Sequence, residues 1–396
     1  MPPKETKTPD RILKLGLVFV FMAIIFFPLS AWWNQQQIHQ LEKSVSQLLQ
    51  EENWNAAEQA AKKWTERDPK NSDAWLDLSE AYRQQNKFAE TADALRQISD
   101  TDPRVLKSLA LRTDLLLSEL NDPIQAIETC QRLLKIDPRV GRARQRLIYI
   151  YAMMLRRLEM VEQIRQAIKL ECEPPEAYVY LLLSDSLNFS NGAPLIHSWL
   201  DNHPENEALE VAMALYIARS GSHRSMQMKD SRVITGGDQS LITNCLKKYP
   251  HNKDVLAFYL EKNLEQGDRD QVAELLEKLS VDAEKDNRFW RFRGQFLVLK
   301  NQLELAEESY RQAILLNPYD WRSRVGLSEI MRRTGKTAEA QGLAQLGAKG
   351  KVFSRQLMEL ENPSQISAAL LEEIAVYARE CGDLKTHEAI QNRIDQ

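Results

Sequence analysis

The chain has 396 residues, of which 43% are hydrophobic, and a formal net charge of −4. The hydrophobic content is sufficient for a core, whereas the slightly acidic balance argues against wholesale nucleic-acid binding, which normally requires a basic domain. The four cysteines are widely separated and form no C-x-x-C pair, so neither a zinc site nor a disulfide framework is expected.

The first predicted element is an apolar segment over residues 12–33, which follows a basic stretch over residues 1–11. As a helix it would be roughly 33 Å long, enough to cross a hydrocarbon core of about 30 Å. Lys14 can reach the interface at one end, and Trp32 and Trp33 suit the interface at the other. The pattern therefore predicts a single transmembrane helix.

The charges that flank this segment predict its orientation. Lys4, Lys7, Arg11 and Lys14 lie on its amino side, and no Lys or Arg occurs between residues 31 and 40. Because positive residues stay cytoplasmic, the rest of the chain is expected outside the cytoplasmic (inner) membrane, in the periplasm of a bacterial cell. A cleaved signal peptide is the alternative, since a positive start followed by an apolar stretch is also its mark.

After the apolar segment, a pattern recurs at an almost fixed interval. Its clearest copy has apolar, small and proline residues at Trp290, Gly294, Ala306, Tyr310, Ala313 and Pro318. Equivalent positions are separated by 34, 35 and 34 residues, and later by 34 and 34: Ala57, Thr91, Ala126 and Met160, then Val272, Ala306 and Ala340. This spacing indicates helical hairpins that bury their apolar faces by stacking on their neighbours.

These positions resemble the tetratricopeptide repeat family, whose pattern is W-x2-L-G-x2-Y, then A-x3-F, then P. The first half of that pattern is matched, with Ser in place of Gly, by Trp75, Leu78, Ser79 and Tyr82. The resemblance implies an all-α fold, a superhelical α-solenoid over residues 35–352 that follows the transmembrane helix. A last hairpin over residues 353–396, with a polar outer surface, would cap the array.

An apolar stripe with heptad spacing lies just after the tryptophans, at Ile38, Leu41, Val45 and Leu48. It has two interpretations. The stripe could dimerise the chain as a short coiled coil, or it could be the buried face of the first helix of the first repeat.

The repeat spacing fails between Pro174 and Pro250, where residues 188–194 are expected to form a turn in a shortened unit. Residues 220–240 are polar and lack a helical period, so they are predicted to be an exposed loop inserted between the two helices of one repeat. Such insertions often lie on the binding face, although a linker without a role is the alternative. The glycines and alanines of residues 342–350 are expected to weaken the second helix of their unit.

The sequence contains no recognised catalytic, cofactor or metal motif. The six histidines have no ligand spacing, and His387–Glu388 lacks the second His that an H-E-x-x-H site needs at position 391. No G-x-S-x-G elbow, phosphate loop or dinucleotide fingerprint occurs. Outside the repeats no segment of about 100 residues is left for a catalytic domain. We therefore expect no enzymatic activity, cofactor or small-molecule substrate.

Aligning each helix with the family pattern implies which side chains face inward, where such repeats bind ligands. The residues placed on this inner face are Arg142, Gln145, Tyr149, Arg288, Arg291, Gln295, Arg322 and Arg332. Because Arg forms forked, charge-assisted bonds to carboxylates, the candidate ligand is an acidic segment or a carboxyl terminus. The alternative is that these arginines only cover a solvated face.

Together these features predict a membrane-anchored, non-enzymatic scaffold that binds partner proteins or peptides for the assembly of an envelope complex. A second hypothesis places the same repeats in the cytoplasm, as a chaperone-like adaptor. A third makes the chain an accessory subunit of an enzyme.

Overall fold

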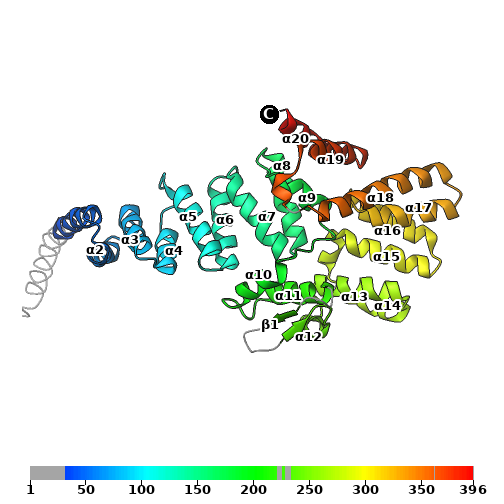
Figure 1. Ribbon diagram of the computed structural model, residues 1–396, viewed down its shortest axis with the longest axis horizontal. Helices are drawn as coiled ribbons and strands as arrows, with labels where there is room; N and C mark the ends of the chain where they lie inside the picture. Colours follow the sequence, from blue (N-terminus) through cyan, green and yellow to red (C-terminus); the bar gives the residue numbers. More distant parts are fainter. Residues whose placement is uncertain (1–31, 221–224, 228–232, 361, 396) are drawn as a thin grey trace, which may run out of the picture. The chain divides into compact units, whose positions relative to one another are not determined.

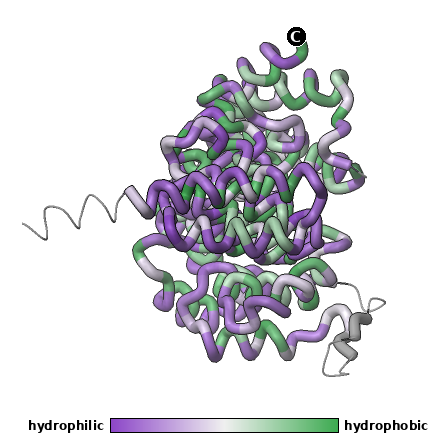
Figure 2. The backbone as a smooth tube through the Cα atoms, turned by 90° about the vertical axis from the view of Figure 1, so that its left-hand side faces the viewer, coloured by the Kyte–Doolittle hydropathy of each residue, from purple (hydrophilic) through white to green (hydrophobic). Residues whose placement is uncertain are grey.

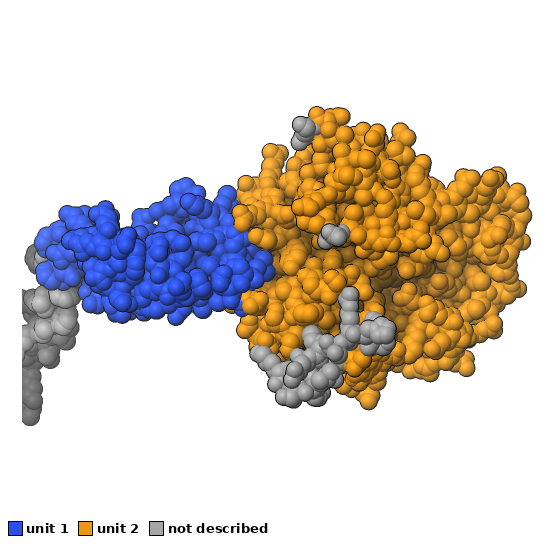
Figure 3. Space-filling model, viewed as in Figure 1, with its two compact units in different colours: residues 1–120 blue, residues 121–396 orange. Residues whose placement is uncertain are grey.

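The structure is a computed structural model that describes residues 32–220, 225–227, 233–360 and 362–395. Across these residues helices follow one another as antiparallel hairpins, so the prediction of stacked helical hairpins is confirmed (Figure 1). The chain divides into two compact units, residues 1–120 and residues 121–396, which we call unit 1 and unit 2 (Figure 3). Each unit is described by itself.

Unit 1 begins with a helix over residues 32–50, followed by α2 (Trp54–Arg67), α3 (Ser72–Gln84), α4 (Phe88–Arg96) and α5 (Val105–Ser118). Its core contains Trp64 and Leu78, and Val45 of the first helix is fully buried against them, with Ile38 and Leu41 partly buried beside it. The apolar stripe at residues 38–48 is therefore the buried face of the first repeat helix, which is the second of its two interpretations.

Two tryptophans at equivalent positions fix the turns that precede their helices. The indole N–H of Trp75 donates to the carbonyl of Pro69 at 2.9 Å, and that of Trp290 donates to the carbonyl of Glu284 at 2.9 Å. Asn71 caps α3 by accepting from the amide of Asp73 at 2.9 Å, which satisfies a backbone donor that the helix leaves unpaired. The repeated sequence pattern thus corresponds to repeated local contacts.

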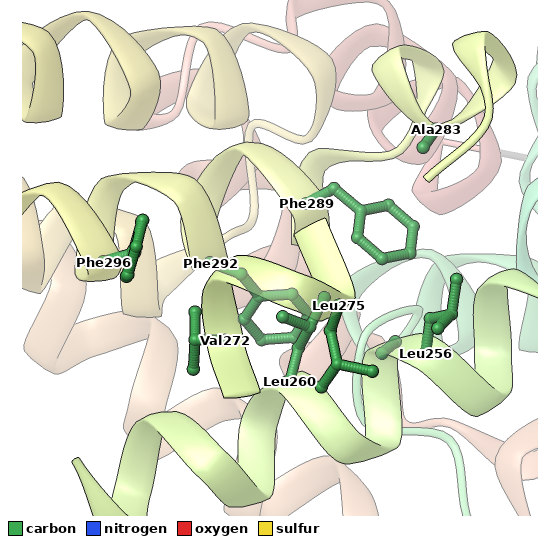
Figure 4. Packing of buried hydrophobic residues seen from close by; sticks show 9 residues of the cluster. Leu256, Leu260, Val272, Leu275, Ala283, Phe289, Phe292 and Phe296 are labelled. Carbon is green, nitrogen blue, oxygen red and sulfur yellow. The ribbon is translucent and has the colours of Figure 1, made fainter. Parts of the chain in front are cut away.

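Unit 2 also consists of helical hairpins, and hydrophobic and hydrophilic residues are interspersed along the helices of the chain (Figure 2). Its core includes Leu256, Val272, Phe289 and Phe292, which pack together from three successive helices (Figure 4). The helices are α6 (Pro123–Ile136), α7 (Gly141–Met153), α8 (Arg157–Lys169), α9 (Glu176–Leu182), α10 (Gly192–Leu200), α11 (Glu207–Arg219), α12 (Ser240–Lys248), α13 (Lys253–Gln266), α14 (Arg269–Glu277), α15 (Asn287–Leu299), α16 (Leu303–Leu316), α17 (Trp321–Arg333), α18 (Thr337–Met358), α19 (Ala368–Glu380) and α20 (Leu384–Ile394). Short 3-10 helices, η1 (Val281–Lys285) and η2 (Pro363–Gln365), precede α15 and α19.

The irregular part of the array is a shortened hairpin followed by an insertion. Helices α9 and α10 have only 7 and 9 residues, as the failed spacing suggests. The insertion lies between α11 and α12, as predicted, but it contains an antiparallel pair of strands, β1 (Ser225–Gln227) and β2 (Val233–Thr235), with Ser225 opposite Thr235. The fold is an all-helical solenoid as predicted, and this short hairpin is a local departure from it, where the β-branched run of β2 favours a strand.

The expectation that glycines weaken the second helix near residue 350 is wrong, because α18 is continuous and 22 residues long. A Cβ added at Gly347 would lie 2.9 Å from Cγ2 of Val325, and one at Gly350 would lie 2.3 Å from the hydroxyl of Tyr377. These glycines let α17 and α19 approach α18 closely, and this packing compensates for their low helix propensity.

Unit 2 also makes contacts between distant parts of its sequence. Helix α8 packs against α20, and α9 packs against η2, so the solenoid is not limited to contacts between neighbouring repeats (Figure 1). We call the contacts of residues 157–187 with residues 285–394 the closing junction. It corrects the expectation that each repeat touches only its neighbours.

The predicted transmembrane segment over residues 12–33 lies outside the described residues, apart from Trp32 and Trp33. Among the helices that the structure does describe, none is both long and apolar enough to span a bilayer.

Candidate functional site

The inner face of α15 is the best-defined cluster of charged side chains in unit 2. Asp286 caps α15 by accepting from the amide of Arg288 at 3.0 Å, and its carboxylate also accepts from the Arg288 guanidinium at 2.7 Å. Arg288 reaches Asp254 of the neighbouring α13 at 2.7 Å. Burial alone would raise the pKa of Asp286, but the guanidinium groups of Arg157 and Arg288 outweigh burial and lower this pKa.

Arg291 lies one turn along the same helix and is 2% exposed. One of its nitrogens donates to Asp185 at 2.7 Å and to Asp320 at 2.7 Å. Asp185 also accepts from the amide of Asn287 at 2.7 Å and lies 3.3 Å from Arg157. Burial would raise the pKa of Asp185, but Arg157 and Arg291 together lower it to about 2.

This geometry corrects the prediction that Arg288 and Arg291 are available to a ligand. Both guanidinium groups are buried and hydrogen-bonded to carboxylates of the same chain. The inferred chemistry, arginine holding a carboxylate, is present at Arg291. In the structure the carboxylate comes from Asp185, more than one hundred residues earlier in the sequence.

Two further polar contacts belong to the closing junction. Arg165 of α8 donates to Asp383, which caps α20 and also accepts from the hydroxyl of Tyr319 at 2.8 Å. Arg393 of α20 donates to the carbonyl of Glu173. The junction is thus formed by α8, α9 and the turns after each of them on one side and by α15, α17 and α20 on the other.

Pockets of about 400 and 560 Å³ flank the start of α8 in unit 2, and both are lined by Arg157. The larger one lies at the closing junction, with Leu158 and Ser184 on one side and Leu316 and Asn317 on the other. The junction therefore contains volume that protein side chains do not fill.

The other predicted inner-face residues are not gathered into one site. On α7, Gln145 is exposed and donates to Glu176 at 2.7 Å, Arg142 is exposed, and Tyr149 is half-buried. Arg322 is half-buried, donates to Ser186 at 3.2 Å and stacks on Trp321. Gln295 is half-buried on α15, and Arg332 is an exposed partner of Glu329.

The sequence-based prediction of the inner face did not include the residues that complete this cluster. They are Arg157, Asp185, Asp286, Asn287 and Asp320. Two of them could have been recognised as helix caps, because Asp286 and Asp320 immediately precede helices and Asp is preferred at that position. Asp185 lies in the segment where the repeat spacing fails, so alignment with the family pattern gives it no position.

Unit 1 has a different inner face, with carboxylates along α3. Asp73, Asp77 and Glu80 share one side of the helix by their spacing, and Glu42 of the first helix is close enough to affect Asp77 electrostatically. Asp73 and Glu80 pair with Arg104 at 2.6 Å and with Arg83 at 2.7 Å. Within the described chain, Asp77 has neither a hydrogen bond nor an ion pair.

The described residues contain no group of three His, Cys, Asp or Glu side chains that could hold a metal ion. All four cysteines are free thiols, and burial raises the pKa of Cys245 to about 11. These thiols give no indication of a nucleophile.

Comparison with known proteins identifies the repeats. Residues 48–114 and residues 288–320 each match a tetratricopeptide repeat family model, and the second match contains the Trp290-to-Pro318 copy. These two segments are tetratricopeptide repeats. The resemblance seen in the sequence is confirmed for these segments. Tetratricopeptide repeats generally mediate protein–protein interactions, through the extended surfaces that stacked repeats create.

Several solved structures are similar to the chain at low identity. A tetratricopeptide repeat protein from Parabacteroides merdae ATCC 43184 is 11% identical, with a TM-score of 0.27, over 75% of this chain and 99% of that one. The APC/C hetero-tetramer Cut9–Hcn1 is 12% identical, with a TM-score of 0.31, over 91% and 79%. Yeast Tom70 is 14% identical, with a TM-score of 0.27, over 91% and 96%. No curated protein has a significant match.

Proposed function

We propose that the protein is a non-enzymatic scaffold, anchored in the cytoplasmic membrane by residues 12–33, that binds a partner protein on the inner face of unit 1. The repeats would lie on the extracytoplasmic side and serve the assembly of an envelope complex. The observation that carries the proposal is the carboxylate surface of α3, where Asp77 has neither a hydrogen bond nor an ion pair among the described residues, whereas the buried arginines of α15 are all paired with carboxylates of their own unit.

Asp77 is the residue of this surface whose charge is least compensated. Burial is the main factor that raises its pKa to about 6, and the nearby Asp73, Glu42 and Glu80 add to the shift, which Arg104 only partly offsets. A positively charged group beside Asp77 would relieve both the desolvation and the repulsion. The surface therefore fits a partner segment rich in Lys or Arg, in contrast to the acidic ligand expected from the arginines of unit 2.

The start of unit 1 supports the anchoring. Trp32 and Trp33 are 59% and 61% exposed, which is unusual for such large apolar side chains and typical of a membrane interface. The helix that contains them is continuous to residue 50 and carries the buried Val45. Because no linker separates the tryptophans from the first repeat, unit 1 would lie close to the bilayer surface.

A direct test combines Asp77→Asn with Glu80→Gln and measures binding of a synthetic Lys-rich peptide by fluorescence anisotropy. The control combines Glu90→Gln with Asp93→Asn, two exposed acids on α4 that lie outside the α3 surface. We expect the first pair to weaken binding at least about tenfold and the control pair to leave it nearly unchanged, with binding that falls as salt rises. Equal binding by both variants would contradict the proposal.

The membrane orientation has its own test. A cysteine introduced at Asp238, at the end of the insertion, would react with a membrane-impermeant thiol reagent in intact cells if the repeats are extracytoplasmic. Labelling only after lysis would instead support the cytoplasmic adaptor.

A further inference from the structure

We propose that Asp185 is an internal ligand of the inner face of α15, that the closing junction is an autoinhibitory contact, and that its opening admits a carboxylate-bearing segment of a partner. This inference rests on the proposed function, the binding of partner proteins by the repeats. It concerns unit 2, whereas the basic-segment site concerns unit 1.

The first support is the way in which Asp185 is held. It lies in the turn after α9, and its carboxylate receives Arg291 at 2.7 Å and Asn287 at 2.7 Å, with Arg157 at 3.3 Å. Arg291 and Asn287 belong to α15, across the junction, whereas Arg157 belongs to α8, on the same side as Asp185. Such convergence of charged and amide donors on one carboxylate is what an arginine-lined surface offers to a bound acidic side chain or chain terminus.

The second support is the polar character of the junction. Its side-chain contacts include Arg157 with Asp286, Arg165 with Asp383, and Asn317 with Ser184 at 3.5 Å. Because desolvation of buried charges offsets much of their attraction, an interface of this kind contributes less net stability than an apolar interface of the same size. A partner that supplies a carboxylate in place of Asp185 would replace part of these contacts and so shift the balance towards the open state.

The third support is incomplete packing. The pocket of about 560 Å³ is lined by residues from both sides of the junction, and Leu316 in its lining is 44% exposed. A junction that served only rigidity would be expected to fill this volume, because protein interiors are close-packed. Opening here exposes the arginines without unfolding any hairpin.

The test measures amide hydrogen exchange of the full-length protein in detergent, first in a variant that lacks the internal carboxylate and then with a small carboxylate added to rescue it. Asp185→Ala removes the internal carboxylate, and we expect exchange in the peptides over residues 179–190 and 285–292 to accelerate about tenfold or more. Exchange in unit 1 and in α13–α14 should not change. Sodium acetate should restore protection, because its carboxylate fills the vacated position, whereas sodium chloride at equal ionic strength should not.

Asp254→Ala is the matched control, since Asp254 pairs with Arg288 at 2.7 Å from the adjacent hairpin and not across the junction. It should leave exchange at residues 179–190 unchanged. Three results would overturn the inference: unchanged exchange in Asp185→Ala, acceleration throughout unit 2 that acetate does not reverse, or an equal effect of Asp254→Ala. Each of these results leaves Lys-rich peptide binding by unit 1 unaffected, so the two proposals fail separately.

Discussion

At the scale of single residues, carboxylates in the two units have opposite electrostatic environments. Asp77 of unit 1 has no ion-pair partner among the described residues, and its pKa is raised to about 6 mainly by burial, which Arg104 only partly offsets. Asp185 of unit 2 is also desolvated, but its two guanidinium neighbours lower its pKa to about 2. The charge of Asp77 therefore opposes folding at neutral pH, whereas the charge of Asp185 supports it.

We predict that Asp77→Asn stabilises unit 1 at pH 8. A carboxyl group whose pKa is raised in the folded state destabilises the fold above that pKa, and stability increases as pH falls from about 6 towards 4. The expected gain is about 1 kcal/mol, below the full linkage value because the side chain is only partly buried and is screened by solvent. Thermal melts at pH 8 and pH 5 measure it. A gain that is equal at both pH values would contradict this explanation.

At the scale of helices, the glycines of α18 show how packing decides whether a residue is tolerated. Gly342 is exposed with nothing near its missing Cβ, whereas Gly350 is buried between α17 and α19. Composition alone predicted a weakened helix for residues 342–350. The contacts that compensate come from Trp321 and Tyr377, which are distant in sequence.

The substitutions Gly342→Ala and Gly350→Ala should therefore change the free energy of unfolding in opposite directions. Ala at position 342 raises helix propensity without a clash, and we expect a gain of about 0.5–1 kcal/mol. Ala at position 350 would place its Cβ 2.3 Å from the Tyr377 hydroxyl and 2.7 Å from Cβ of Trp321, and overpacking should cost about 1–3 kcal/mol. Denaturant midpoints of the two variants check this. Stabilisation by Gly350→Ala would show that α18 does not approach its neighbours closely.

Most helices could be predicted from the sequence, because their apolar spacing, prolines and capping residues are local signals. Trp75, Leu78 and Ala306 occupy the turn-anchoring or buried positions that the family pattern implies. The closing junction could not be predicted in this way. Asp185 and Arg291 are 106 residues apart, and their contact depends on how strongly the whole array of unit 2 curves.

At the scale of the whole of unit 2, the closing junction should make stability fall in acid. Asp185, Asp286 and Asp383 have lowered pKa values because arginines overcome the effect of burial. Carboxyl groups of this kind stabilise the fold above their unfolded-state pKa near 4 and lose that contribution as pH falls towards their folded-state pKa. Protection of the junction amides should thus be constant from pH 8 to 5, after correction for intrinsic exchange. It should decline only below about pH 4, and a decline that begins above pH 6 would require another titrating group.

Closure of unit 2 is the central claim, and cysteine cross-linking measures it most directly. Ser184 Oγ and Asn317 Nδ2 are 3.5 Å apart across the junction and 133 residues apart in sequence. In full-length Ser184→Cys/Asn317→Cys protein, we predict that mild oxidation links these two positions, as identified by mass spectrometry of unreduced peptides. The absence of this link in protein that retains wild-type helicity would contradict the account.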